Sequence, residues 1–163
     1  MQRYVPSSSP TQLAPRPPAT GRVVVRPPRP RPSRSTVAAD LDDLRFIGEH
    51  CLASRQRDGV YLYFNALNNV IANWQQAGQV EVSLHECLGN LNRPVRLNYG
   101  EAYAILIYCS CPDVADKTRS KWARALRYAD EHKQDDETIA AFMMRKGGIN
   151  ACTALYARQR RKR

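Results

Sequence analysis

The sequence predicts an all-α protein, a compact bundle of six or seven helices preceded by a disordered arm rich in proline and arginine. Two observations support this fold class. Through most of residues 36–157, apolar residues recur every three or four positions, which is the period of an amphipathic helix. Nine of the eleven prolines lie in residues 1–38, where they remove backbone donors and leave too few apolar groups for a core.

Charge divides the chain into a basic arm over residues 1–35, a helical domain over 36–157 and a basic tail over 158–163. The net charge is +10. Residues 1–38 hold seven arginines and no acid, and the tail holds five cations and no acid, whereas residues 39–157 hold 13 cations and all 15 acids. Cationic ends favour a polyanionic partner, because binding releases counterions. Solubility is the alternative role of these ends.

The first helices are predicted from caps and spacing. A hydroxyl at Ser35–Thr36 can cap a first helix, and a second follows the turn at Asp58–Gly59 and ends at Gly78. The next segment is ambiguous, because Val80, Val82 and Leu84 alternate as in a strand. We expect a short extended stretch there, followed by a short helix from Leu84.

The later helices are predicted in the same way. One opens after Pro94 and is ended by Pro112, and Asp113 can cap the next, with residues 118–120 as a candidate break. The acidic residues 135–137 are predicted to start another short helix. Gly147 and Gly148 end it, and Asn150 is well suited to cap the last helix.

Residues 120–157 have the helix lengths and short links of a trihelical unit that resembles a helix-turn-helix. In such units the last helix enters the major groove, so Asn150 and Thr153, near its start, are the candidates for base contacts. Cations beyond them would contact phosphate: Arg158, Arg160, Arg161, Lys162 and Arg163. Three packed helices joined by a glycine turn also occur in proteins that bind no DNA.

A second candidate surface lies on the preceding helix. Lys117, Lys121, Arg124 and Tyr128 are spaced by four, three and four residues, which places them on one face. A basic stripe with an aromatic residue suits a surface that follows phosphates. The alternative is an ordinary solvated helix face.

Metal and catalytic sites are not expected. His85-Glu86-Cys87 and Cys109-Ser110-Cys111 lack the spacing of a zinc signature, and an odd number of cysteines among apolar neighbours is typical of free thiols. The histidines stand beside no nucleophile motif, and Gly147–Gly148 lacks the rest of a phosphate-binding loop. We therefore predict a protein that is not an enzyme and has no cofactor.

The function predicted from the sequence is that of a non-enzymatic DNA-associated protein, such as a small transcriptional regulator, with duplex DNA as the favoured partner. One alternative is a protein-protein interaction module whose basic ends serve solubility or an acidic partner. RNA binding is a second, although the aromatic-rich sheet motifs of common RNA readers are missing. No membrane-spanning run or secretory signal is found in the sequence, so an intracellular location is expected.

Overall fold

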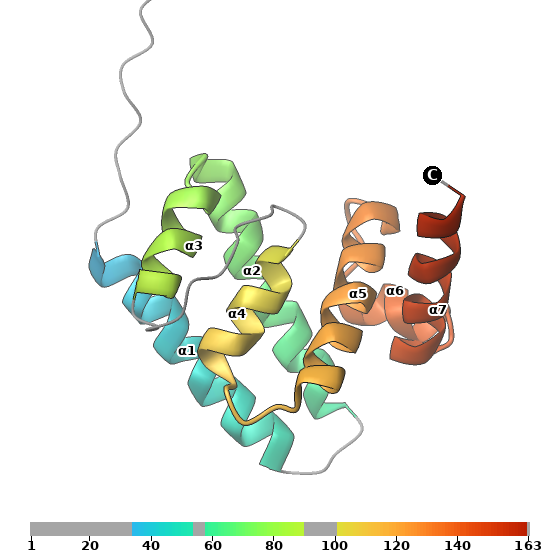
Figure 1. The fold of residues 1–163 in the computed structure, drawn as a ribbon, viewed down its shortest axis with the longest axis horizontal. Coiled ribbons are helices and arrows are strands. Elements are labelled where there is room, and N and C mark those ends of the chain that lie inside the picture. The colour runs from blue at the N-terminus through green and yellow to red at the C-terminus, as the bar shows by residue number, and fades with distance from the viewer. Residues whose placement is uncertain (1–33, 54–57, 90–100, 163) are drawn as a thin grey trace, which may run out of the picture.

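Seven helices make up the fold of the residues that the structure describes, 34–53, 58–89 and 101–162 of a computed structural model (Figure 1). The predicted all-α bundle is confirmed. Most of the predicted arm lies outside the described residues. The helices are α1 (Arg34–Ala53), α2 (Gly59–Ala77), α3 (Val80–Gly89), α4 (Ala102–Ser110), α5 (Asp116–His132), α6 (Ile139–Arg145) and α7 (Gly148–Arg161).

Helices α2 and α4 form the centre of the molecule. The sequence of α4, AYAILIYCS, carries no charge, and seven of its residues are buried. Helix α2 buries Tyr63, Phe64 and Leu67 completely, at the spacing of one helical face. Around this pair, α1 packs on α2 and α4, α3 packs on α4, and α5 covers the other side of α4. The apolar core therefore lies mainly within the first four helices.

Two tryptophans join the outer helices to this core. Trp74 on α2 is buried, and its Nε1–H donates to a carboxylate oxygen of Asp40 on α1 at 2.8 Å. Trp122 on α5 is half-buried and meets the Phe64 ring edge-on, with 5.4 Å between ring centroids. The second contact attaches α5 to the core, and α6 packs directly on α2.

The prediction for residues 80–84 was wrong, because α3 is helical from Val80 onward. Val80 and Leu84 are buried one turn apart, whereas Val82 is 46% exposed. Three apolar residues at alternate positions therefore imitated a strand, although the middle one faces solvent. Helix α5 differs from expectation as well, since it starts at Asp116 after an extended Ala115 and continues unbroken through residues 118–120.

The predicted starts of the last two helices also need correction. The cap of α6 is Thr138, whose Oγ1 accepts from the Ala141 amide at 3.2 Å, and the acidic residues 135–137 precede it. Helix α7 begins at Gly148 after Gly147, and their φ angles are +89° and +94°. Asn150 therefore lies inside the first turn of α7 and does not cap it. The glycine pair is the turn itself, in a backbone conformation that favours glycine.

Candidate nucleic-acid interface

Helices α5 and α7 lie side by side and run in the same direction (Figure 1). Three contacts show the direction, because residue numbers rise together along both helices. The Thr153 hydroxyl reaches the Lys121 carbonyl oxygen at 3.2 Å, and the Arg127 guanidinium lies 5.2 Å from the centre of the Tyr156 ring. One turn further, Gln159 Nε2 donates to Glu131 Oε2 at 3.3 Å.

Tyr156 holds two guanidinium groups at the far end of this helix pair. Its ring is buried, with Arg127 from α5 on it, while the Arg160 guanidinium lies 5.7 Å from the same ring. Arg160 Nε also donates to the Tyr156 hydroxyl at 3.2 Å. Cation–π contacts of this kind position a guanidinium without neutralising it. We name the surrounding cations the basic end: Arg124, Arg127, Arg158, Arg160, Arg161 and Lys162.

The exposed face of α7 forms a regular stripe. Asn150, Ala154, Arg158 and Arg161 are all exposed and are separated by four, four and three residues, so they share one side of the helix. The opposite side buries Cys152 and Tyr156 against the rest of the protein. The stripe thus offers an amide, a small side chain and two guanidiniums in a row.

Helix α5 contributes a second row of cations beside α7. Lys117 and Arg124 are exposed and Lys121 is half-buried, as the predicted stripe requires. The Tyr128 ring already has partners within the protein. It stacks on His132, with ring centroids 4.3 Å apart, and it also contacts Phe142.

The two residues nominated for base contacts have different environments. The Thr153 hydroxyl lies within hydrogen-bonding distance of the Ile149 and Lys121 carbonyl oxygens, at 2.8 and 3.2 Å, in the contact between α5 and α7. We therefore withdraw Thr153 as a base-reading residue. Asn150 is exposed and lines a cavity of about 590 Å³ together with Lys121, Tyr61 and the glycine pair.

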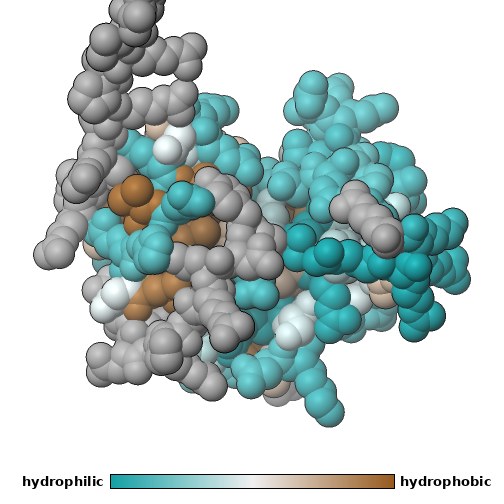
Figure 2. Space-filling model, turned by 45° about the horizontal axis from the view of Figure 1, so that its top comes forward, coloured by the Kyte–Doolittle hydropathy of each residue, from teal (hydrophilic) through white to brown (hydrophobic). Residues whose placement is uncertain are grey.

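Charge differs strongly between the two halves of the described chain. Up to the end of α4, the described residues hold eight acids and only two cations, Arg34 and Arg45. Residues 112–162 hold seven acids and twelve cations. These cations are Lys117, Arg119, Lys121, Arg124, Arg127, Lys133, Arg145, Lys146, Arg158, Arg160, Arg161 and Lys162. The most hydrophilic residues accordingly gather over the α7 side of Figure 2, and the apolar ones over the other half.

Few of these cations are neutralised by an ion pair. Within the described part of the chain, Arg119 pairs with Asp116 at 3.3 Å and Arg145 with Glu137 at 2.6 Å, and the other ten make no ion pair. The Arg145 guanidinium lowers the pKa of the Glu137 carboxyl by hydrogen bonding to it. The whole basic end therefore keeps its charge available for an external anion.

Most of the basic tail belongs to helix α7. Helix α7 continues through Arg161, and Lys162 follows as its C-cap residue, so the cations from Arg158 to Arg161 are held on a helix. Arg163 lies beyond the described residues. Sequence reasoning missed Arg127, although it follows Arg124 by three residues and so shares its side of α5.

The geometry around the His85 and Cys109 segments does not favour a metal site. The Cys109 thiol lies near the carbonyl oxygen of buried Cys87, at 3.8 Å from Sγ, whereas His85 is exposed on α3. Among residues 34–53, 58–89 and 101–162, no three His, Cys, Asp or Glu side chains are grouped as metal ligands. All five cysteines are free thiols.

Comparison with known proteins finds no matching family model, curated protein or solved structure. None of the described helices is long and apolar enough to cross a membrane.

Proposed function

We propose that this protein binds duplex DNA through α7 and the neighbouring face of α5, without catalysing a reaction, as a small regulator inside the cell would. The observation that carries the proposal is the basic end, where positioned guanidiniums lack carboxylate partners while the first four helices are acidic. A basic region beside an acidic one orients the protein toward a polyanion.

The stripe on α7 has the dimensions of a helix that reads a groove. From Asn150 to Arg161 it spans twelve residues, about 16 Å along the helix axis. The major groove of B-DNA admits one α-helix. Ala154, at the middle of the stripe, leaves room for close approach of the helix to the base edges.

The proposal gives these residues different tasks. Arg158, Arg160, Arg161 and Lys162 contact phosphates, which fixes the position of the protein without reading sequence. On α5, Lys117, Lys121 and Arg124 contact phosphates of the other DNA strand. Asn150 is the one candidate for a base contact, since an amide can bond adenine through two atoms.

Binding titrations against duplex DNA, single-stranded DNA and RNA at two salt concentrations test this function. The first variant is Arg158→Gln/Arg161→Gln, and its matched control, Lys133→Gln/Lys146→Gln, removes the same charge outside the basic end. The first variant should lower duplex affinity and flatten the dependence of log affinity on log salt by about 0.9 for each phosphate that it no longer neutralises. Equal salt slopes for both variants, or a preference for RNA, would contradict the proposal.

One observation favours the alternative of a protein-binding module. Phe46 on α1 and Leu62 on α2 are 62% and 61% exposed, on two helices that pack together. Exposed apolar side chains are common docking points when they are contiguous. This alternative predicts that none of the three nucleic acids binds at physiological salt, and that Phe46→Ser/Leu62→Ser abolishes capture of a protein partner.

A further inference from the structure

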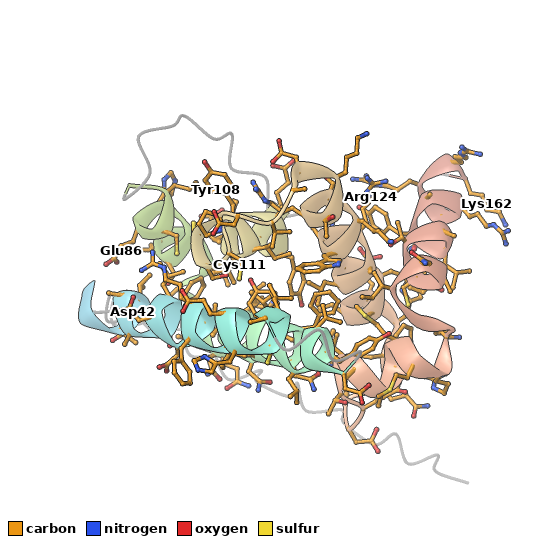
Figure 3. All side chains as sticks on the ribbon, turned by 90° about the horizontal axis from the view of Figure 1, so that it is seen from below. Asp42, Glu86, Tyr108, Cys111, Arg124 and Lys162 are labelled. Atoms are coloured by element: carbon orange, nitrogen blue, oxygen red, sulfur yellow. The ribbon has the colours of Figure 1, made fainter. Side chains whose placement is uncertain are left out.

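An acidic end lies opposite the basic end. Asp42 and Asp43 on α1 and Glu81 on α3 are exposed, and Glu86 on α3 is half-exposed. We name these four residues the acidic end. Helices α1 and α3 pack on one another, so the four carboxylates lie on neighbouring helices. In Figure 3, Asp42 and Glu86 lie at one extreme of the molecule, while Arg124 and Lys162 lie toward the other.

Little within the described residues offsets the charge of the acidic end. Arg45 pairs with Asp42 at 2.9 Å, but both side chains remain accessible, at 48% and 73% exposure. Its Nε also donates to the Cys109 carbonyl oxygen at 3.3 Å, which holds Arg45 toward α4. Asp43, Glu81 and Glu86 have no ion pair among the described residues. This surface thus offers carboxylates to a cationic partner.

We infer that the partner is a second copy of this chain, whose basic end docks on the acidic end of its neighbour. The charges are opposite in kind: the acidic end presents four carboxylates, and the basic end presents six cations, two of them guanidiniums that a buried tyrosine holds in place. Guanidinium and carboxylate groups pair through two parallel hydrogen bonds, so a surface with several of each is self-complementary.

The placement of the two ends determines the kind of assembly. Because the contact joins different surfaces of the two copies, each dimer keeps one acidic end and one basic end unoccupied. Further copies add in the same way, and the association is an open head-to-tail chain. The contact consists of exposed ion pairs, so it is weak and salt-sensitive. Self-association should appear at low ionic strength and disappear at high ionic strength.

Sedimentation velocity of the full chain tests the inference. At about 20 mM salt the weight-average mass of the wild-type protein should rise with concentration, and at about 500 mM it should be that of the monomer. Asp42→Asn/Asp43→Asn/Glu81→Gln alone, and Arg158→Gln/Arg161→Gln/Lys162→Gln alone, should remain monomeric in low salt. Two pairs of substitutions outside the ends, Asp135→Asn/Asp136→Asn and Lys133→Gln/Lys146→Gln, are the controls and should associate as the wild type does.

Mixing the two triple variants gives the sharpest result. Each keeps one intact end, so the mixture should form one-to-one dimers that grow no further. Thermal melting of each variant verifies that it is folded. Two results would overturn the inference: triple variants that associate like the wild type, or association that depends on residues 1–33 and not on the basic end. The second result would assign the acidic end to the arginine-rich arm.

The inference and the proposed function can fail separately. Asp42→Asn/Asp43→Asn/Glu81→Gln leaves every proposed DNA contact in place, so at concentrations below self-association its duplex affinity should equal that of the wild type. Loss of DNA binding in the basic-end variant says nothing about the acidic end, whereas the one-to-one mixture requires both ends.

Discussion

Helices α4 and α7 show how differently two helices of one small protein can be used. Helix α4 has no charged residue and buries seven of its nine residues, so it contributes to the interior of the molecule. Helix α7 buries only Cys152 and Tyr156 and turns an amide and several cations outward. The difference indicates that α4 contributes mainly to the stability of the fold, whereas α7 presents a surface.

The largest expected effect is on the core that links these regions. Phe64 is completely buried and contacts the ring of Trp122, so Phe64→Ala should lower the free energy of unfolding by about 3–5 kcal/mol. Chemical denaturation measures the change. Leu62→Ala, two residues away and exposed, is the control and should change stability by less than about 0.5 kcal/mol. Equal losses for both variants would refute the assignment of the core face of α2.

The glycine pair should show the next largest effect. At Gly148 the backbone has φ of +89°, and an added Cβ would lie 3.3 Å from the Tyr61 hydroxyl oxygen. Gly148→Ala should therefore destabilise the protein by about 1–3 kcal/mol. Gly89→Ala, with no neighbour within 4 Å, is the matched control and should be nearly neutral. A neutral Gly148→Ala would mean that the turn into α7 does not require glycine.

The variant Asn150→Ala distinguishes a role of this residue in DNA binding from a role in folding. Because it does not cap α7, Asn150→Ala should leave the melting temperature unchanged. If its amide contacts a base, the same variant should lose about 1–3 kcal/mol of affinity for a preferred duplex and almost none for others. Melting and titration of one preparation distinguish the roles, and a loss of stability without a loss of affinity would remove Asn150 from the site.

The smallest expected effect concerns the pH dependence of the Glu137–Arg145 pair. The pKa of Glu137 is lowered in the folded protein, so the pair stabilises the fold above the unfolded pKa of the carboxyl and this stabilisation is lost as pH falls through the folded value. Glu137→Gln should lower the melting temperature slightly at pH 7. Below the folded pKa of the carboxyl the difference from the wild type should vanish, and a difference that persists there would point to packing.

Most of the fold could be predicted because apolar spacing and glycine caps are local signals. Helix α2 is the clearest case, since its buried residues recur in threes and fours and Gly78 ends it with φ of +66°. Helix α3 was misjudged because ten residues are too few to distinguish helix from strand by periodicity. The start of α7 was misplaced because the positive φ of two successive glycines is not visible in a sequence.

The candidate site could be predicted only where it depends on one helix. The cations of α7 and the row on α5 follow from spacing, and both are exposed or half-exposed as expected. The relation between these helices depends on tertiary packing. Between α5 and α7, the Thr153 hydroxyl contacts the Lys121 carbonyl oxygen and the Arg127 guanidinium lies on the Tyr156 ring. Neither contact follows from the spacing along a single helix.

The most direct test of the account is a map of backbone amide chemical shifts during titration with a short DNA duplex. We predict that the signals of Ala154, Arg158 and Arg161 move with the largest amplitude, that those of Lys121 and Arg124 follow, and that those of Asp42, Asp43 and Glu81 stay in place. Shifts centred on α1 and α3, or a spectrum unchanged by excess duplex, would contradict the claim that the C-terminal helices form a DNA-binding surface.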